Sequence, residues 1–252
     1  MFFIQRIASS HMDTKEKIVN DILKKKSISG ISEEVVKSEL DSYLKKEKIS
    51  IVSLTKKDIS LIVHDLRSIL RKLSGRFRKE SDEDFHISTD ERLEFYKEVK
   101  YEISKINPKR ILDLGCGINP LFLAEKKVTY NAYDIDETSI DKVKSYFNEN
   151  GITGEVKSLD IRKKYLFPKS DLCLMLKVLD LVDKEGHKTA EMIIRNTDSK
   201  NYIISFSTKT LSGKPMNHPQ RGWIEHLLSR LGYSFTTLKT TNEIYYIAKK
   251  LS

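Results

Sequence analysis

Two closely spaced glycines follow a short apolar segment and could place a ligand against the main chain. Residues 110–114 read as a strand that carries Asp113 toward its end, and Gly115 and Gly117 come directly after it. Glycine lacks a Cβ atom, so the turn can be tight and a ligand can approach the backbone. In open parallel sheets, ligands bind at this end of the strands. Pro120 replaces the third glycine of a dinucleotide fingerprint, which favours a nucleoside without a pyrophosphate; a glycine turn without a ligand is the alternative.

Acidic side chains close the next two predicted strands. Asp134 ends the segment 128–134, where a carboxylate can accept hydrogen bonds from both hydroxyls of a ribose. Asp136 reads as the N-cap of the following helix. Asp160 follows the segment 155–159 and either contacts an adenine amino group or begins a loop. The predicted cofactor is therefore S-adenosylmethionine (SAM). Its predicted binding residues here are Asp113, Gly115, Gly117, Asp134 and Asp160.

Positive charge is concentrated toward the N-terminal part of the chain. The net charge is +9 and the isoelectric point is about 9.2. Between positions 67 and 79 no acidic residue interrupts the basic residues Arg67, Arg71, Lys72, Arg76, Arg78 and Lys79. Such a cluster can contact phosphates without reading sequence. The charge favours a nucleic-acid partner over an acidic membrane surface, with an ordinary solvated surface as the alternative.

The remaining composition limits the class of protein. Cys116 and Cys173 lie in apolar segments without a nearby second cysteine, which favours a reducing cytoplasm over a disulfide framework or a zinc site. There is no run of about 18 apolar residues, so we predict no membrane span and no membrane partner. Residues 1–11 end in Ser-Ser-His-Met, read as a remnant of an expression vector, and are left out of the fold prediction.

The elements that must position these residues fall into two blocks. Helical spacing predicts helices near 18–23, 35–44, 59–73 and 89–103, with Ser32 as an N-cap. From residue 110 onward, apolar strands alternate with helices, which predicts a parallel, doubly wound sheet. The predicted strands are 110–114, 128–134, 155–159, 171–178, 201–206 and a terminal hairpin of 233–240 and 243–249; the predicted helices are 137–149, 184–197 and 219–231. The predicted fold is α/β, a seven-stranded Rossmann-like sheet of the SAM-dependent methyltransferase type with an N-terminal all-helical domain.

Four blocks together give the sequence a family resemblance. They are 86–92 (HISTDER), 111–121 (ILDLGCGINPL), 174–179 (LMLKVL) and 205–214 (SFSTKTLSGK). On these blocks the chain resembles the aminoglycoside-resistance 16S rRNA methyltransferases of the guanine-N7 class. The second block contains Asn-Pro, a feature of that family and not of methyltransferases in general.

The resemblance implies SAM-dependent methylation of N7 of guanine 1405, in decoding-site helix 44 of 16S rRNA. The substrate would be the assembled 30S subunit and the phenotype aminoglycoside resistance. Independently of the resemblance, the cysteines favour the cytoplasm, and nothing in the sequence requires a dimer, so we expect a monomer. By the same resemblance, the guanidinium of Arg92 would form two hydrogen bonds with the SAM carboxylate. The alternative is that Arg92 forms an ion pair on the surface of a helix. The chain departs from the family in a shorter loop after Lys214 and in Gln220, where the family has a tyrosine.

The implied reaction defines what further residues would do. Guanine N7 has a lone pair and loses no proton, so the enzyme mainly positions a base that has left its stack. A buried Lys177 at the end of an apolar strand needs a partner, and guanine O6 or a phosphate would serve. Trp223 either stacks on the base or anchors a helix, and Lys209 and Lys214 contact RNA or are solvated. The predicted catalytic residues are Lys177, Lys209 and Trp223.

Two other functions compete with this one. The chain could methylate a different rRNA site, a tRNA or a small molecule, although a small-molecule enzyme would not need the basic helices. It could also be a SAM-binding, ribosome-associated factor without turnover. In the favoured interpretation, residues 12–84 dock on the 30S subunit and residues 85–252 carry the active site.

Overall fold

The computed structural model describes residues 14–28, 30–74, 95–183, 186–210 and 213–251. The chain divides into two units, residues 1–78 and 79–252, and each is described by itself. The predicted boundary between residues 84 and 85 lies outside the described residues and stays a prediction. None of the described helices combines the length and the apolar character needed to span a bilayer.

The first unit is built from helices with buried apolar faces. A helix over residues 14–23 precedes η1 (Lys26–Ile28), α2 (Glu33–Lys46), η2 (Ile51–Ser53) and α3 (Lys56–Leu73). Ser32 caps α2, as predicted, because its hydroxyl accepts a hydrogen bond from the backbone N–H of Val35 (3.4 Å). Thr55 and Asp58 form a capping box at the start of α3. The buried side chains include Ile18, Ile22, Val36, Leu40, Ile62, Leu66 and Leu70.

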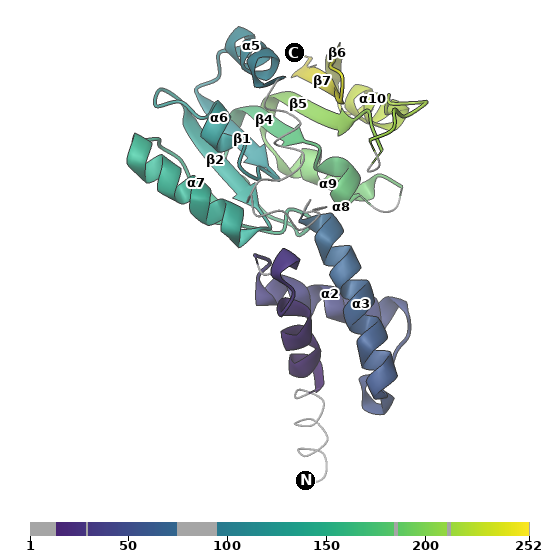
Figure 1. Cartoon of the computed structure of the whole chain (residues 1–252). Helices are drawn as coiled ribbons and strands as arrows, with labels where there is room; N and C mark the ends of the chain where they lie inside the picture. Colours follow the sequence, from purple (N-terminus) through teal and green to yellow (C-terminus); the bar gives the residue numbers. More distant parts are fainter. Residues whose placement is uncertain (1–13, 29, 75–94, 184–185, 211–212, 252) are drawn as a thin grey trace. The chain divides into compact units, whose positions relative to one another are not determined.

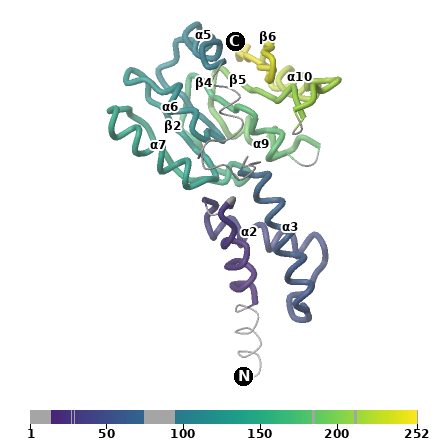
Figure 2. Tube along the Cα trace, viewed as in Figure 1, coloured from purple at the N-terminus to yellow at the C-terminus, as the bar shows by residue number. Residues whose placement is uncertain are grey.

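A seven-stranded sheet organises the second unit (Figure 1). The strands are β1 (Arg110–Leu114), β2 (Thr129–Asp134), β3 (Val156–Ser158), β4 (Ser170–Leu176), β5 (Ser199–Ser207), β6 (Tyr233–Lys239) and β7 (Glu243–Lys250). Their order is β3-β2-β1-β4-β5-β7-β6. The first five strands pair in parallel, whereas β7 runs antiparallel to both β5 and β6. Figure 2 shows how the terminal hairpin returns beside β5. The predicted fold class is confirmed.

Helices cover both faces of this sheet. They are α5 (Tyr96–Ile106), α6 (Pro120–Leu123), α7 (Glu137–Asn150), α8 (Leu179–Val182), α9 (Lys188–Asn196) and α10 (Gly222–Arg230). One apolar cluster joins alternate strand residues to α8, α9 and α10, and the other joins the intervening residues to α5 and α7. Along β4, Cys173 and Met175 belong to the first cluster and Leu172 and Leu174 to the second. Burial on both faces explains the continuous apolar character of this strand.

Some element boundaries differ from the sequence prediction. The prediction carried β4 through residue 178, but the strand ends at Leu176 because Lys177 adopts a positive φ of 57° and Val178 is already the N-cap of α8. The helices α6 and α8 were missed because four residues are too few to show helical periodicity. The helix start predicted at residue 89 lies outside the described residues and stays a prediction. The helix α5 starts at Tyr96 and ends before Asn107, as predicted.

Gly115 links the packing of the sheet to the predicted ligand turn. Its φ is +68°, and a Cβ atom there would lie 2.3 Å from Cγ2 of Val178. We expect Gly115→Ala to destabilise the protein by about 3 kcal/mol, because overpacking adds to the cost of a left-handed alanine. Gly151→Ala is the matched control, since its φ is +61° and nothing lies within 4 Å. It should cost only about 1 kcal/mol. Urea unfolding measures both, and equal losses would contradict the role given to Val178.

Candidate functional site

A strand-end carboxylate holds the glycine turn after β1. Asp134 accepts hydrogen bonds from the backbone N–H groups of Gly117 (2.7 Å) and Asp136 (2.8 Å), one on each carboxylate oxygen. The N–H groups of Gly115 and Cys116 both donate to one carbonyl oxygen of β2, at 2.8 and 3.1 Å. Parallel pairing of β1 and β2 brings these ends together. The predicted ligand turn is therefore fixed to the end of the neighbouring strand.

Three buried carboxylates surround this turn: Asp113, Asp134 and Asp136. Burial raises the pKa of the Cys116 thiol well above its usual value, and the charges of these three carboxylates raise it further. The thiol therefore stays protonated, which removes it from nucleophilic chemistry. Asp136 occupies the N-cap position of α7, as predicted, with its carboxylate accepting from the Ser139 hydroxyl (2.6 Å). The concentrated negative charge suits cationic groups and hydroxyl donors and opposes a pyrophosphate.

Two tyrosines that the sequence analysis did not single out complete the surroundings of the turn. The Tyr130 hydroxyl donates to Asp113 (2.7 Å), and the Tyr96 hydroxyl donates to Asn119 (2.8 Å). The Tyr96 ring also stacks on Phe122, with ring centroids 4.7 Å apart. The only signal in the sequence was a tyrosine within an apolar segment, whose buried hydroxyl needs a polar partner.

Asp160, just after β3, is held by an arginine. The guanidinium of Arg162 donates from Nε to one carboxylate oxygen (2.8 Å) and from Nη2 to the other (2.7 Å). Burial raises the pKa of Asp160, but the hydrogen bonds and charge of Arg162 outweigh this and hold the pKa below its ordinary value. The carboxylate is therefore ionised and fixed in orientation. Its contact with an adenine amino group stays a prediction.

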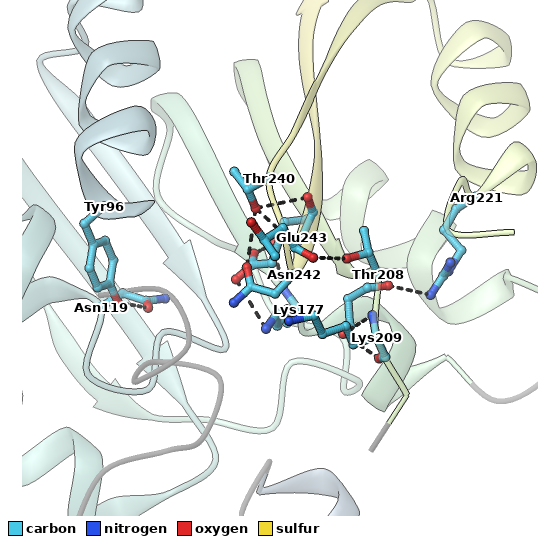
Figure 3. A network of polar contacts seen from close by, with 12 residues as sticks. Tyr96, Asn119, Lys177, Thr208, Lys209, Arg221, Thr240, Asn242 and Glu243 are labelled. Carbon is cyan, nitrogen blue, oxygen red and sulfur yellow. Dashed lines mark hydrogen bonds and ion pairs between the residues drawn. The ribbon is translucent and has the colours of Figure 1, made fainter. Parts of the chain in front are cut away.

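Lys177 follows β4 and is held by residues of two other strands (Figure 3). Its Nζ lies 3.4 Å from Oε1 of Glu243, the first residue of β7. Oε2 of Glu243 accepts from the Ser205 hydroxyl (2.7 Å), and the Lys177 backbone N–H donates to the Ser205 carbonyl (3.0 Å). The side chains of Lys177 and Glu243 are 10% and 0% exposed. A buried lysine needs a polar partner, and Glu243 of the same chain provides it. The sequence did not indicate this partner.

Trp223, near the start of α10, packs against two rings. The His187 ring stacks on it with centroids 4.1 Å apart and an interplanar angle of 2°, and Phe206 meets it nearly edge-on at 5.6 Å. His187 is oriented in turn by Asp183, with Nδ1 2.8 Å from the carboxylate. The imidazole covers one face of the indole, so a base stacked on that side would meet His187 first. The stacking role of Trp223 stays a prediction.

Arg221 fixes the segment between β5 and α10. Its guanidinium donates to the Pro219 carbonyl (2.7 Å), the Asp180 carboxylate (2.9 Å) and the Ser207 carbonyl (3.3 Å). It also lies over the Phe206 ring, 5.4 Å from the centroid. Nothing in the sequence singles out Arg221, because its three polar partners come from separate parts of the chain.

The segment after β5 carries the two lysines predicted to contact RNA. Lys209 pairs with Pro215 in an isolated antiparallel bridge and is partly exposed, whereas Lys214 is exposed. The Thr208 backbone N–H donates to the Asn242 carbonyl (3.0 Å), which ties this segment to the turn before β7. Asn242 is the residue before Glu243, so this bond joins the segment of Lys209 to the start of β7 (Figure 3). The RNA contacts stay predictions.

Residues 82–247 match the family described as Ribosomal RNA methyltransferase (FmrO). The chain belongs to this family. The resemblance seen in the four sequence blocks is thus confirmed, and the matched region includes β1 to β6 in full and β7 as far as residue 247.

The names of curated relatives of this chain state a defined target. A 16S rRNA (guanine(1405)-N(7))-methyltransferase from Proteus mirabilis is 30% identical over 178 residues, which are 66% of this chain and 63% of the relative. A protein of the same name from Micromonospora echinospora is 28% identical over 178 residues, with the same coverage. The match thus spans about 63% of the length of these two relatives.

Solved structures share the fold of the chain at lower sequence identity. The 16S rRNA methylase RmtB superposes with a TM-score of 0.74 at 20% identity, covering 94% of this chain and 98% of that one. The 16S rRNA methyltransferase RmtF in complex with S-adenosyl-L-homocysteine has a TM-score of 0.72 at 18% identity, with the same coverage.

The predicted basic residues of this FmrO-family chain are only partly described. Arg76, Arg78, Lys79 and Arg92 lie outside the described residues. In the first unit, the Arg67 guanidinium donates to the Asp21 carbonyl, Arg71 Nε donates to the Arg67 carbonyl (3.2 Å), and Lys72 is exposed. Arg67 therefore has a structural contact in addition to any role toward RNA.

The ion pair of Asp160 predicts a pH-dependent contribution to stability. A pKa below the ordinary 3.8 means that the pair stabilises the fold above that value and loses its effect as the pH falls through the folded-state pKa. We expect Arg162→Gln to cost about 2 kcal/mol near pH 7. The difference from the parent protein should shrink as the pH falls below 3.8. Urea unfolding across pH measures it, and a difference that stays constant into acid would contradict the assignment.

Proposed function

We propose that this chain is a SAM-dependent methyltransferase that modifies N7 of guanine 1405 in 16S rRNA. Its substrate is the assembled 30S subunit in the cytoplasm, it acts as a monomer, and the modification confers aminoglycoside resistance. The observation that carries the proposal is the acid-lined glycine turn in a chain of the rRNA methyltransferase family. Two further facts support it: the activity in the names of the curated relatives, and the S-adenosyl-L-homocysteine in the RmtF structure.

The residues around the turn fit this cofactor, which supplies a sulfonium methyl group when bound. A carboxylate can accept about four hydrogen bonds, so the two backbone amides on Asp134 are compatible with bonds from ribose hydroxyls. The carboxylates of Asp113, Asp134 and Asp136 favour the positive charges of a sulfonium and an ammonium group. In this proposal Asp160 accepts from the adenine amino group, and Arg92 pairs with the cofactor carboxylate.

The chain's task in this reaction is to position the base. N7 of guanine carries a lone pair and no proton, so no side chain has to act as a general base. Lys177 donates a hydrogen bond to guanine O6, and the His187–Trp223 stack offers a platform for the extruded ring. Lys209 and Lys214 hold the RNA backbone beside that site.

Transfer of label from radioactive SAM tests the proposal. Purified 30S subunits, naked 16S rRNA and tRNA are offered in parallel, and the product is mapped by primer extension. We expect label on the 30S subunit at guanine 1405. Label only on tRNA or a small molecule would reject the target, and binding of SAM without any transfer would favour a ribosome-associated factor without turnover.

Asp134→Asn tests the cofactor site independently of the RNA. The variant puts an amide where two backbone N–H groups and a ribose need acceptors, so we expect SAM to bind about 10- to 100-fold more weakly. The matched control is Asp141→Asn, an exposed residue of α7. Calorimetry with SAM measures both affinities. Equal affinities in the two variants would remove Asp134 from the site.

We also propose that the first unit docks on the 30S subunit. This unit has a groove of about 330 Å³, whose lining includes the basic residues Lys17, Lys24, Lys56 and Arg67. Phosphate contacts of this kind add affinity that falls steeply with salt.

A double charge reversal, Arg71→Glu with Lys72→Glu, tests this docking. We expect weaker 30S binding and a shallower salt dependence, because two potential phosphate contacts are lost, with unchanged affinity for SAM. Reversal of Lys45 and Lys46, two exposed lysines of α2, is the matched control. Sedimentation with 30S subunits at two salt concentrations measures binding. Loss of SAM affinity in the Arg71/Lys72 variant would show instead that these residues serve the fold.

A further inference from the structure

The buried Lys177–Glu243 pair has an unusual position for a structural ion pair. Figure 3 shows Lys177 near Glu243. The pair lies where β4 and β5 end and β7 begins, which is the same edge of the sheet as the glycine turn after β1. Glu243 is 0% exposed and is oriented by the Ser205 hydroxyl at 2.7 Å. Lys177 also adopts a left-handed backbone conformation. Buried ion pairs add little net stability, because desolvation offsets the attraction. A contribution to stability therefore does not explain why this pair is buried at the site.

We infer that Glu243 neutralises the charge of Lys177, so that its ammonium group recognises guanine O6 as a hydrogen-bond donor without adding positive charge beside the reacting base. This inference rests on the proposed function. Glu243 is then a positioning residue that acts through Lys177, and Ser205 holds its carboxylate in place.

Recognition is the first argument for this role. Guanine presents two adjacent acceptors, N7 and O6, whereas adenine presents an amino donor beside its N7. An ammonium group has three donors and no acceptor, so it accepts guanine in this orientation and opposes adenine. A phosphate clamp would need net positive charge, and the buried carboxylate 3.4 Å away cancels that charge. The pair therefore favours O6 over the phosphate as the ligand of Lys177.

The movement of charge is the second argument. During transfer, the N7 lone pair forms the new bond to the methyl carbon while the carbon–sulfur bond breaks and its electron pair stays on sulfur. Positive charge thus passes from the sulfonium to the guanine ring. An ammonium group without a counter-ion beside O6 would repel this developing charge, and in a poorly solvated site such repulsion is large. Glu243 removes that repulsion while Lys177 keeps its hydrogen bond.

A double-mutant cycle separates this role from a merely structural one. The variants are Glu243→Gln, Lys177→Met and the two combined, with Glu191→Gln as the matched control. Glu191 lies on α9 and also forms ion pairs, with Arg195 and Arg230. Each protein is assayed for thermal unfolding, SAM affinity, 30S binding and single-turnover methyl transfer.

We expect Glu243→Gln to slow methyl transfer about 100-fold, because an ammonium without its counter-ion faces the base. Its 30S binding should be unchanged or tighter. The combined variant should be faster than Glu243→Gln, about 10-fold below the parent, since removing Lys177 also removes the repulsion. Glu191→Gln should transfer at the parent rate. Ser205→Ala, which only releases the Glu243 carboxylate, should slow transfer several-fold and serves if Glu243→Gln does not fold.

The outcomes separate this inference from the proposed function. A combined variant as slow as or slower than Glu243→Gln, or an unaffected Ser205→Ala where Glu243→Gln is unfolded, overturns charge neutralisation while the methyltransferase assignment stands. A parent enzyme that methylates only adenine or cytosine overturns the recognition of O6. A parent enzyme that methylates no RNA overturns the proposed function and this inference together.

Discussion

A single buried carboxylate at the end of β2 sets the geometry of the cofactor side of the molecule. Asp134 receives two backbone N–H groups, one from the glycine turn after β1 and one from the start of α7. The turn after β1, the end of β2 and the start of α7 are therefore tied to one side chain that burial keeps from solvent. The turn itself requires Gly115, since Val178 occupies the space of a Cβ atom. The packing of the sheet and the shape of the ligand site therefore both depend on the absence of a side chain at Gly115.

The antiparallel hairpin at the end of the chain completes the other side of the site. In a purely parallel sheet, the first residue of a strand lies at the edge away from the ligand. Because β7 runs antiparallel to β5, its first residue, Glu243, lies beside Ser207 at the carboxyl edge. The reversal therefore brings an acid from the start of a strand to Lys177 at the end of another. The turn before β7 also binds Thr208, which donates hydrogen bonds to the carbonyls of Thr241 and Asn242. These bonds hold the segment that carries Lys209.

Sequence reasoning recovered what depends on local pattern and lost what depends on tertiary pairing. Strand alternation and the terminal hairpin followed from residue periodicity, and the carboxylates Asp113, Asp134 and Asp160 followed from their place at strand ends. Periodicity cannot show that Lys177 meets Glu243, because the contact exists only after β7 inserts beside β5. Arg162 shows a different limit. It is two residues from Asp160, yet nothing in the sequence distinguishes a forked ion pair from two solvated charges.

The carboxylates at the turn and the Lys177–Glu243 pair can both be related to the movement of charge during methyl transfer. Three carboxylates surround the turn where a sulfonium would sit, so positive charge is favoured there before reaction. Transfer to a neutral base moves that charge away from the carboxylates, which by itself opposes the reaction. Any additional positive charge near the base would raise the energy of the transition state further.

Methyl transfer in such a site is therefore faster when the base is recognised by hydrogen-bond donors whose positive charge is neutralised by a neighbouring carboxylate. The side chain of Lys177 is 10% exposed, and it is paired with a carboxylate that is 0% exposed. Basic residues that attract RNA are instead suited to the exposed surface, where solvent and counter-ions screen them from the reacting atoms.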